Sequence, residues 1–284
     1  SATIFNASTS SVSAVDTEID DVFQFISDGL SDFAIKKYEA IRSRNDGRLT
    51  TKQEYRLDAN IGHAHYAKHD FDLASQFYLR AVTFYLESKE SRAIQILGYF
   101  LAGNRPKVLE LATELHTDVP EFSQAWAFWV RGHSDKADLD QIILQIPENH
   151  RNDAEVAMAL ADKAIRASNY DAYVEHSRIA VLASPDWPEA QASLGAALVT
   201  RAKANAIVHP DIGLVPVESE ALCEANDILT QAIQTFGERD CKKHLAGVYF
   251  NRSAAHKLLG VKSESLNDLQ MAFKLDPHDP TIAA

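Results

Sequence analysis

Three histidines within seven residues form the first candidate for a chemical site in this chain. His63, His65 and His69 lie in the stretch IGHAHYAKHDFDLASQFYLRA, residues 61–81. His65 and His69 are four residues apart, a spacing that lets two side chains of one helix ligate the same zinc ion. His63 falls on another face of that helix, and no HExxH sequence or third ligand lies nearby. We therefore expect no metal site and interpret the histidines as packing, turn and surface residues.

A cysteine and a histidine form the second candidate, because Cys241 precedes His244 by three residues. Such a pair can act as a nucleophile and its base, but a third residue that would orient the base is not identifiable. The sequence contains no GxSxG, P-loop or GxGxxG motif. We therefore predict that the chain is not an enzyme and uses no cofactor. Cys223 and Cys241 are too few for a disulfide framework and indicate free thiols in a reducing compartment.

Charge and hydropathy exclude two further classes of function. The 284 residues include 28 Lys and Arg against 40 Asp and Glu, a formal net charge of −12. Binding to duplex nucleic acid needs clustered cations, so we expect no nucleic-acid partner. No apolar run approaches the roughly 18 residues that span a bilayer, so we expect no membrane insertion. We predict a cytoplasmic protein, or a periplasmic one if a signal was removed.

An internal period organises most of the chain. Gly62 lies on one expected helix, and Ala74, Tyr78 and Ala81 share one face of the next. Adding 34 residues to the last three positions reaches another apolar set, Val108, Ala112 and Leu115. The Ser- and Thr-rich residues 1–15 show no such pattern, so we expect a flexible segment there and a repeat domain over residues 16–284.

The last unit carries the clearest motif, ending in LDPHDP, with small, aromatic and turn residues at Tyr249, Ser253, Gly260, Ala272 and Pro277. These positions resemble the tetratricopeptide repeat, a 34-residue helix–turn–helix unit with the pattern W-x2-L-G-x2-Y…A-x3-F…P. The resemblance covers roughly residues 18 to 280. It implies an all-α fold, a right-handed superhelical solenoid of about six to seven repeats.

Two units depart from this pattern. The unit over residues 123–153 is about three residues short, which predicts truncated helices or an irregular turn. The unit that begins at Pro188 carries an insertion near residues 201–219, before a helix expected over 221–236. Each unit contains apolar residues that either pack on the solenoid or form a docking patch. These residues are Trp126 and Trp129 in the short unit and Ile212 and Leu214 in the insertion.

The resemblance implies a concave groove, lined by the first helix of every pair, that binds a protein or peptide partner. Repeat phase then assigns polar side chains to this groove: Arg56, His63, Tyr66, Arg131, Asp162, Arg166, Asn251 and Lys257. Some relatives clamp a chaperone's terminal carboxylate with Lys and Asn, but Ala59, His63 and Ile94 here lack that charge pattern. The alternative to an interaction scaffold is a sensor, regulatory or assembly arm of a larger multidomain enzyme or signalling protein, which could form a homo-oligomer.

Overall fold

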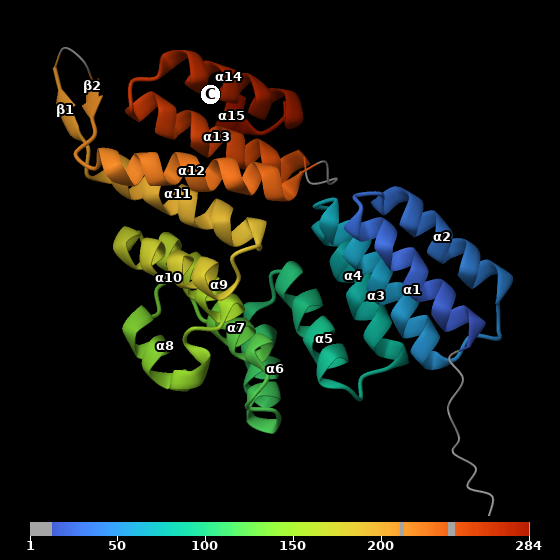
Figure 1. Ribbon diagram of the computed structural model, residues 1–284. Coiled ribbons are helices and arrows are strands. Elements are labelled where there is room, and N and C mark those ends of the chain that lie inside the picture. The colour runs from blue at the N-terminus through green and yellow to red at the C-terminus, as the bar shows by residue number, and fades with distance from the viewer. Residues whose placement is uncertain (1–12, 211–212, 238–241, 284) are drawn as a thin grey trace, which may run out of the picture.

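The structure is a computed structural model that describes residues 13–210, 213–237 and 242–283. In this part of the chain, α-helices dominate, and two short strands form a hairpin (Figure 1). The helices are α1 (Ala14–Ser27), α2 (Ser31–Arg44), α3 (Thr51–Ala67), α4 (Phe71–Phe84), α5 (Lys89–Leu101), α6 (Arg105–Asp118), α7 (Ser123–Gly132), α8 (Leu139–Gln145), α9 (Ala154–Arg166), α10 (Tyr170–Ala183), α11 (Pro188–Ala204), α12 (Ser219–Phe236), α13 (Lys242–Leu258), α14 (Lys262–Leu275) and α15 (Pro280–Ala283).

Successive helix pairs stack along the chain, and the stack bends into an arc (Figure 1). α3 packs on α4, α9 on α10, α11 on α12 and α13 on α14, while α4 also contacts α5 and α6 contacts α7. Each pair therefore buries its apolar face against the next pair, which a single pair cannot do alone. The all-α solenoid implied by the repeat resemblance is confirmed.

A residue in the left-handed backbone region ends the first helix of most pairs. These residues are Gly29 (φ 78°), His69 (φ 62°), Gly103 (φ 73°), Ser168 (φ 57°) and Gly260 (φ 80°). In each case the N–H of the next residue donates to the carbonyl five residues earlier, at 2.7 to 2.9 Å, which satisfies an exposed helix terminus. His69 therefore occupies the place of a turn glycine, as the sequence predicts.

Ion pairs between an arginine and a buried carboxylate connect the two helices of some units. Asp58 on α3 is fully buried and accepts two hydrogen bonds from the guanidinium of Arg80 on α4, both at 2.6 Å. Asp268 on α14 accepts from Arg252 on α13 at 2.9 and 2.6 Å. A planar guanidinium binds both carboxylate oxygens at once, which fixes the register between the two helices as well as neutralising the buried charge.

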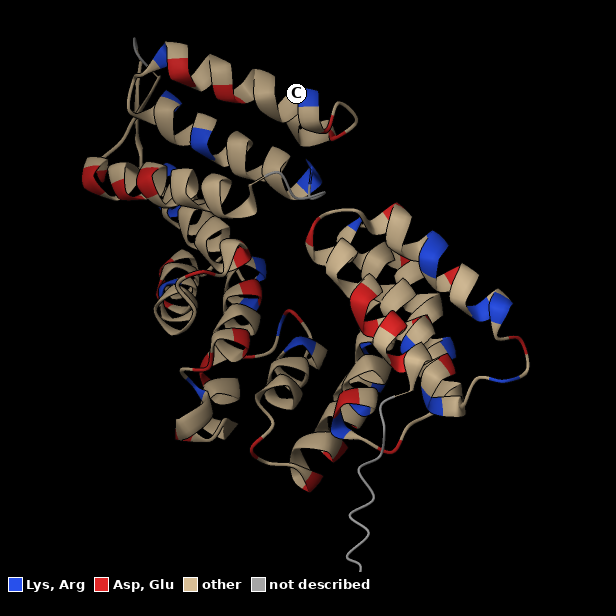
Figure 2. Cartoon of the chain, turned by 45° about the vertical axis from the view of Figure 1, so that its right-hand side comes forward, with Lys and Arg blue, Asp and Glu red and all other residues tan. Residues whose placement is uncertain are grey.

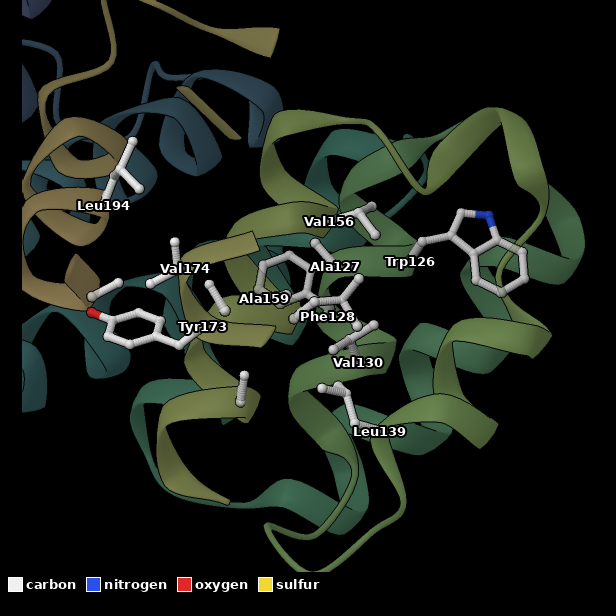
Figure 3. Close-up of a cluster of buried hydrophobic side chains, with 14 of the residues drawn as sticks. Trp126, Ala127, Phe128, Val130, Leu139, Val156, Ala159, Tyr173, Val174 and Leu194 are labelled. Carbon is white, nitrogen blue, oxygen red and sulfur yellow. The ribbon is translucent and has the colours of Figure 1, made fainter. Parts of the chain in front are cut away.

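The shortened unit has truncated helices, as predicted. α7 contains 10 residues and α8 contains 7, and a 3₁₀ turn over Glu148–His150 follows them. Trp126 and Trp129 are each only 7 % exposed and belong to the main hydrophobic cluster. Figure 3 shows Trp126 among the side chains of this cluster. The indole N–H of Trp126 donates to the carbonyl of Pro120 at 3.1 Å. Because both indoles are buried, the docking-patch interpretation is wrong for these two residues.

The insertion forms the antiparallel hairpin of β1 (Ile207–His209) and β2 (Gly213–Val215), for which the sequence shows no strand pattern. Val208 pairs with Leu214, and the hairpin projects beyond the ends of α11 and α12 (Figure 1). Three-residue strands are too short to produce a recognisable alternation. The helix expected after the insertion is α12. Ile212 lies outside the described residues.

The first described helix, α1, begins at Ala14, two residues before the expected start of the repeat domain. Ser13 caps α1, its hydroxyl accepting from the backbone N–H of Asp16 at 3.2 Å, so residues 14 and 15 are already helical. Residues 1–12 are outside the described part of the chain. In the described ranges, none of the helices has the length and apolar character needed to cross a bilayer.

Candidate functional site: a cavity on the first helices

A cavity of about 470 Å³ lies where first helices of successive pairs face one another. Side chains from α3, α5, α7 and α9 line it, together with Trp187 just before α11. Four of the residues assigned to the groove from repeat phase line this cavity: Arg56, His63, Tyr66 and Arg131. Residues of four successive repeats therefore meet in one place because the first helices stack with the same face toward the cavity.

α3 presents its cavity residues on one helical face. Arg56, His63 and Tyr66 are separated by seven and three residues, so they lie along one side of the helix. Leu57 and Ile61 lie on the other side, where both are fully buried in the N-terminal core. The helix is thus amphipathic, and burial of its apolar side determines which side faces the cavity.

His63 is a neutral hydrogen-bonding residue in the wall of the cavity. Burial lowers the pKa of His63 to about 4, so the ring is uncharged at neutral pH. Its Nδ1 lies 2.8 Å from the hydroxyl of Tyr78, whose own pKa burial raises well above its ordinary value. The protonated Tyr78 hydroxyl and the neutral ring therefore share one hydrogen bond, and the tautomer of His63 determines which of the two donates.

The two arginines of the cavity already have partners. Arg56 is hydrogen-bonded to Asp16 at 2.7 Å and to Asp20, both on α1. The guanidinium of Arg131 lies 3.5 Å from the carboxylate of Asp162. Because each positive charge is neutralised from within the chain, the arginines do not make the cavity attractive to an anion.

Two carboxylates provide the unbalanced charge of the cavity. Glu155 accepts from the amide of Gln124 at 3.0 Å through Oε1, whereas its Oε2 is buried and lacks a hydrogen-bond partner within the described chain. Glu90 makes no ion pair with another described residue. A buried acceptor without a donor costs about 1–3 kcal/mol, which a donor from a ligand would recover. Phe128 and Trp187 supply apolar surface in the same cavity.

The phase of the repeat did not assign these two glutamates to the groove, although both have a recognisable position in their helices. Glu90 and Glu155 are both in the first turn of a first helix, α5 and α9. A carboxylate is favourable there because it opposes the positive end of the helix dipole. The same position is common for solvated glutamates in any helix, so the sequence alone does not distinguish a cavity residue from a surface one.

The remaining predicted groove residues lie elsewhere. Asp162 and Arg166 on α9 line a neighbouring hollow of only about 10 Å³, beside Arg131. Arg166 lies 3.7 Å from Asp135. Asn251, on α13, is half-buried and lines none of the cavities described here. Lys257 lines a different cavity on the last helix pair.

The histidine cluster has structural contacts. The ring of His65 stacks on Phe77 with 5.4 Å between the ring centroids. The ring of His69 meets that of His244 edge to face, with 4.2 Å between the centroids. In the described ranges, no group of three or more His, Cys, Asp or Glu side chains is arranged to hold a metal ion. Cys241, the nucleophile considered from the sequence, lies outside those ranges.

Comparison with known proteins identifies the fold. No protein-family model matches the sequence, and no curated protein matches it. A solved tetratricopeptide repeat protein from Parabacteroides merdae matches with a TM-score of 0.52 and 14 % identity, over 95 % of this chain and 96 % of that one. The Cut9–Hcn1 hetero-tetramer of the APC/C matches with a TM-score of 0.54 and 13 % identity, over 94 % of this chain and 46 % of that one. These similarities show that the chain has a tetratricopeptide-like helical-repeat fold.

Proposed function

We propose that this chain is a non-catalytic scaffold that binds a segment of a partner protein in the cavity formed by α3, α5, α7 and α9. The observation that supports this most directly is the convergence of four repeats on one cavity of about 470 Å³. A chain of similar fold is part of the Cut9–Hcn1 hetero-tetramer, which is consistent with a role in protein assembly.

The chemistry of the cavity indicates how a segment would bind. Ala59 and Ala93 on facing helices leave room for an incoming side chain, and Phe128 offers an apolar contact. The unpaired oxygen of Glu155 would accept a hydrogen bond from a backbone N–H or a cationic side chain of the partner. Apolar surface would supply most of the affinity, and the carboxylate would select and orient the segment.

Affinity capture from the native lysate tests this proposal with a groove variant and a matched control. The groove variant is Tyr66→Ala with Glu155→Gln. The control is Phe33→Ala with Glu39→Gln, since Phe33 and Tyr66 are both 44 % exposed and α2 lies outside the cavity. We expect proteins that wild type and the control retain to be lost from the groove variant. Equal retention by all three chains would exclude this cavity as the binding site, and no retained protein would contradict the scaffold function.

A further inference from the structure

A second and larger cavity lies at the C-terminal end of the solenoid. It has a volume of about 920 Å³ and is lined by α13, α14 and the hairpin of the insertion. Phe250 and Leu258 of α13 and Leu266 and Leu269 of α14 form its apolar floor. Leu266 is 55 % exposed and Leu269 36 %, which is a large exposure for leucines on a stable helix pair.

The shape of this surface fits a helix. In the earlier pairs the next first helix packs on the preceding second helix, as α11 does on α10 and α13 does on α12. Here α15 contacts α14, and its Ile282 packs at one end of the cavity. Lys262, Leu266 and Leu269 follow one another at four and three residues along α14. This stripe is of the kind that a neighbouring helix covers.

The charge of the rim is opposite to that of the whole chain. Lys203 from α11, Lys257 from α13 and Lys262 from α14 line the cavity, and all three are exposed. None of them makes an ion pair with a residue of the described chain, and no carboxylate lines the cavity. Figure 2 shows basic residues at the hairpin side of α13 and α14. In a chain of net charge −12, three unpaired lysines around one apolar cavity form a local cationic site.

The insertion contributes a wall to this site. Gly213 and Leu214 of β2 line the cavity beside Lys203 at the end of α11. Leu214 was assigned from the sequence to a docking patch and Lys257 to the groove, and the structure brings them into the same cavity. The hairpin thus extends the surface of the last pair sideways, which enlarges the area available to a partner.

We propose that this surface, defined by Lys203, Leu214, Lys257, Lys262, Leu266 and Leu269, docks an amphipathic helix of a partner protein. The apolar stripe of that helix packs on Leu266 and Leu269. Glu or Asp residues that flank the stripe pair with the three lysines, which gives the complex its charge selectivity. This site is separate from the cavity on α3, α5, α7 and α9, so it does not depend on the function proposed for that cavity.

A displayed library of amphipathic helices tests the proposal on the full chain. Each helix of about 18 residues carries a fixed Leu stripe, with Glu or Lys at random at the flanking positions. We expect selection on wild type to enrich Glu-flanked helices about tenfold or more over Lys-flanked ones. The preference should reverse on the Lys257→Glu, Lys262→Glu variant. It should persist on Lys36→Glu, Lys274→Glu, a control with the same change of charge at residues that do not line the cavity.

Equal helicity by circular dichroism verifies that both lysine variants fold. Leu266→Asp provides a second test, because a charge in the apolar stripe should remove the binding of every helix. The proposal is overturned if Lys-flanked helices are enriched equally, if no helix is enriched, or if the Glu preference survives on Lys257→Glu, Lys262→Glu. Two other results would overturn the proposal and assign this surface to another occupant. Binding of wild type, but not of that variant, to phosphatidylserine vesicles without any helix selection would assign the surface to a membrane. A concentration-dependent dimer that the variant loses would assign it to a second copy.

Discussion

At the scale of single residues, the histidines of this chain serve its structure. His63 is hydrogen-bonded to Tyr78, and His69 provides the left-handed residue of a turn. Burial lowers the pKa of both His63 and His69 to about 4. Their neutral rings pack as aromatic side chains at neutral pH. Lowering the pH should therefore lower the free energy of unfolding, because the buried rings would have to become charged.

The first prediction concerns the pH dependence of stability at His63. Its folded pKa of about 4 lies below the ordinary value of 6.5, so the unfolded chain binds more protons between these pH values. Stability from this residue is complete above pH 6.5 and is lost as the pH falls toward 4. Between pH 7 and 4, wild type should lose about 3 kcal/mol more unfolding free energy than His63→Gln. Urea denaturation at each pH measures this.

The exposed His278→Gln serves as the control for simple loss of an imidazole. If wild type and His63→Gln lost the same free energy over this pH range, the ring of His63 would not be the neutral, buried group described here.

The second prediction concerns the two turns that end α5 and α9. Ser168 has φ 57° and its side chain makes no hydrogen bond to the described chain, so Ser168→Gly should raise the unfolding free energy by about 1 kcal/mol. Gly103 has φ 73° with open space around its Cα, so Gly103→Ala should lower it by about 1–2 kcal/mol. Thermal unfolding of the two variants should thus shift in opposite directions, and a shift in one direction would contradict the assigned backbone.

At the scale of elements, close approach between helices determines where glycine is needed. A Cβ on Gly62 of α3 would lie 2.6 Å from the ring of Tyr78 on α4. That ring is fully buried and its hydroxyl is held by His63, so it cannot move aside freely. The small residue that marks the repeat in the sequence is therefore the contact point between the two helices of the unit.

The third prediction compares this glycine with one that has no neighbour. Gly62→Ala should lower the unfolding free energy by about 1–3 kcal/mol through overpacking against Tyr78. Gly247→Ala, on α13 with nothing within 4 Å of the added methyl group, should raise it by about 0.5–1 kcal/mol through helix propensity. Urea unfolding followed by circular dichroism measures both, and loss of stability in both variants would argue against specific packing at Gly62.

At the scale of the whole molecule, the two largest of the four hydrophobic clusters in the described residues divide most of the solenoid between them. One lies over α1 to α3, and the larger one extends from α5 to α14. Leu79 of α4 packs against Gly98 of α5, and the hydroxyl of Ser75 donates to the carbonyl of Gly98 at 2.9 Å. The edge contact between His69 and His244 is a second link, made across the arc. A repeat stack is coupled through such local interfaces, so its parts can open separately.

The fourth prediction tests this coupling at Gly98. A side chain there meets Leu79 at 2.9 Å, so Gly98→Val should weaken the α4–α5 interface. Amide hydrogen exchange in α1–α4 should accelerate about tenfold or more, while exchange in α9–α13 should stay unchanged. Mass spectrometry of peptic peptides measures it, with Gly247→Ala as the control. Uniform acceleration along the chain would show that the solenoid unfolds as one unit.

The sequence alone determined the helix pairs and their order, and it marked the turn at His69 and the small residue at Gly62. These features depend on short-range physics: apolar spacing, a left-handed residue such as His69, and a small residue such as Gly62. The phase of the repeat also assigned Arg56, Tyr66 and Arg131 to the side of the first helices that lines the cavity. They line it because stacked first helices present the same face, and their role in binding a partner stays a prediction.

Only the tertiary structure decided which of these residues are in contact and which charged groups remain without a partner. It buried Trp126, paired Arg56 with Asp16, and left Glu155 with an unsatisfied oxygen. It also brought Lys257 to Leu214, and His69 to His244 across 175 positions of sequence. The physical reason is that such contacts depend on the rotation accumulated over several repeats and on side chains from other helices. A local sequence pattern does not specify this accumulated rotation.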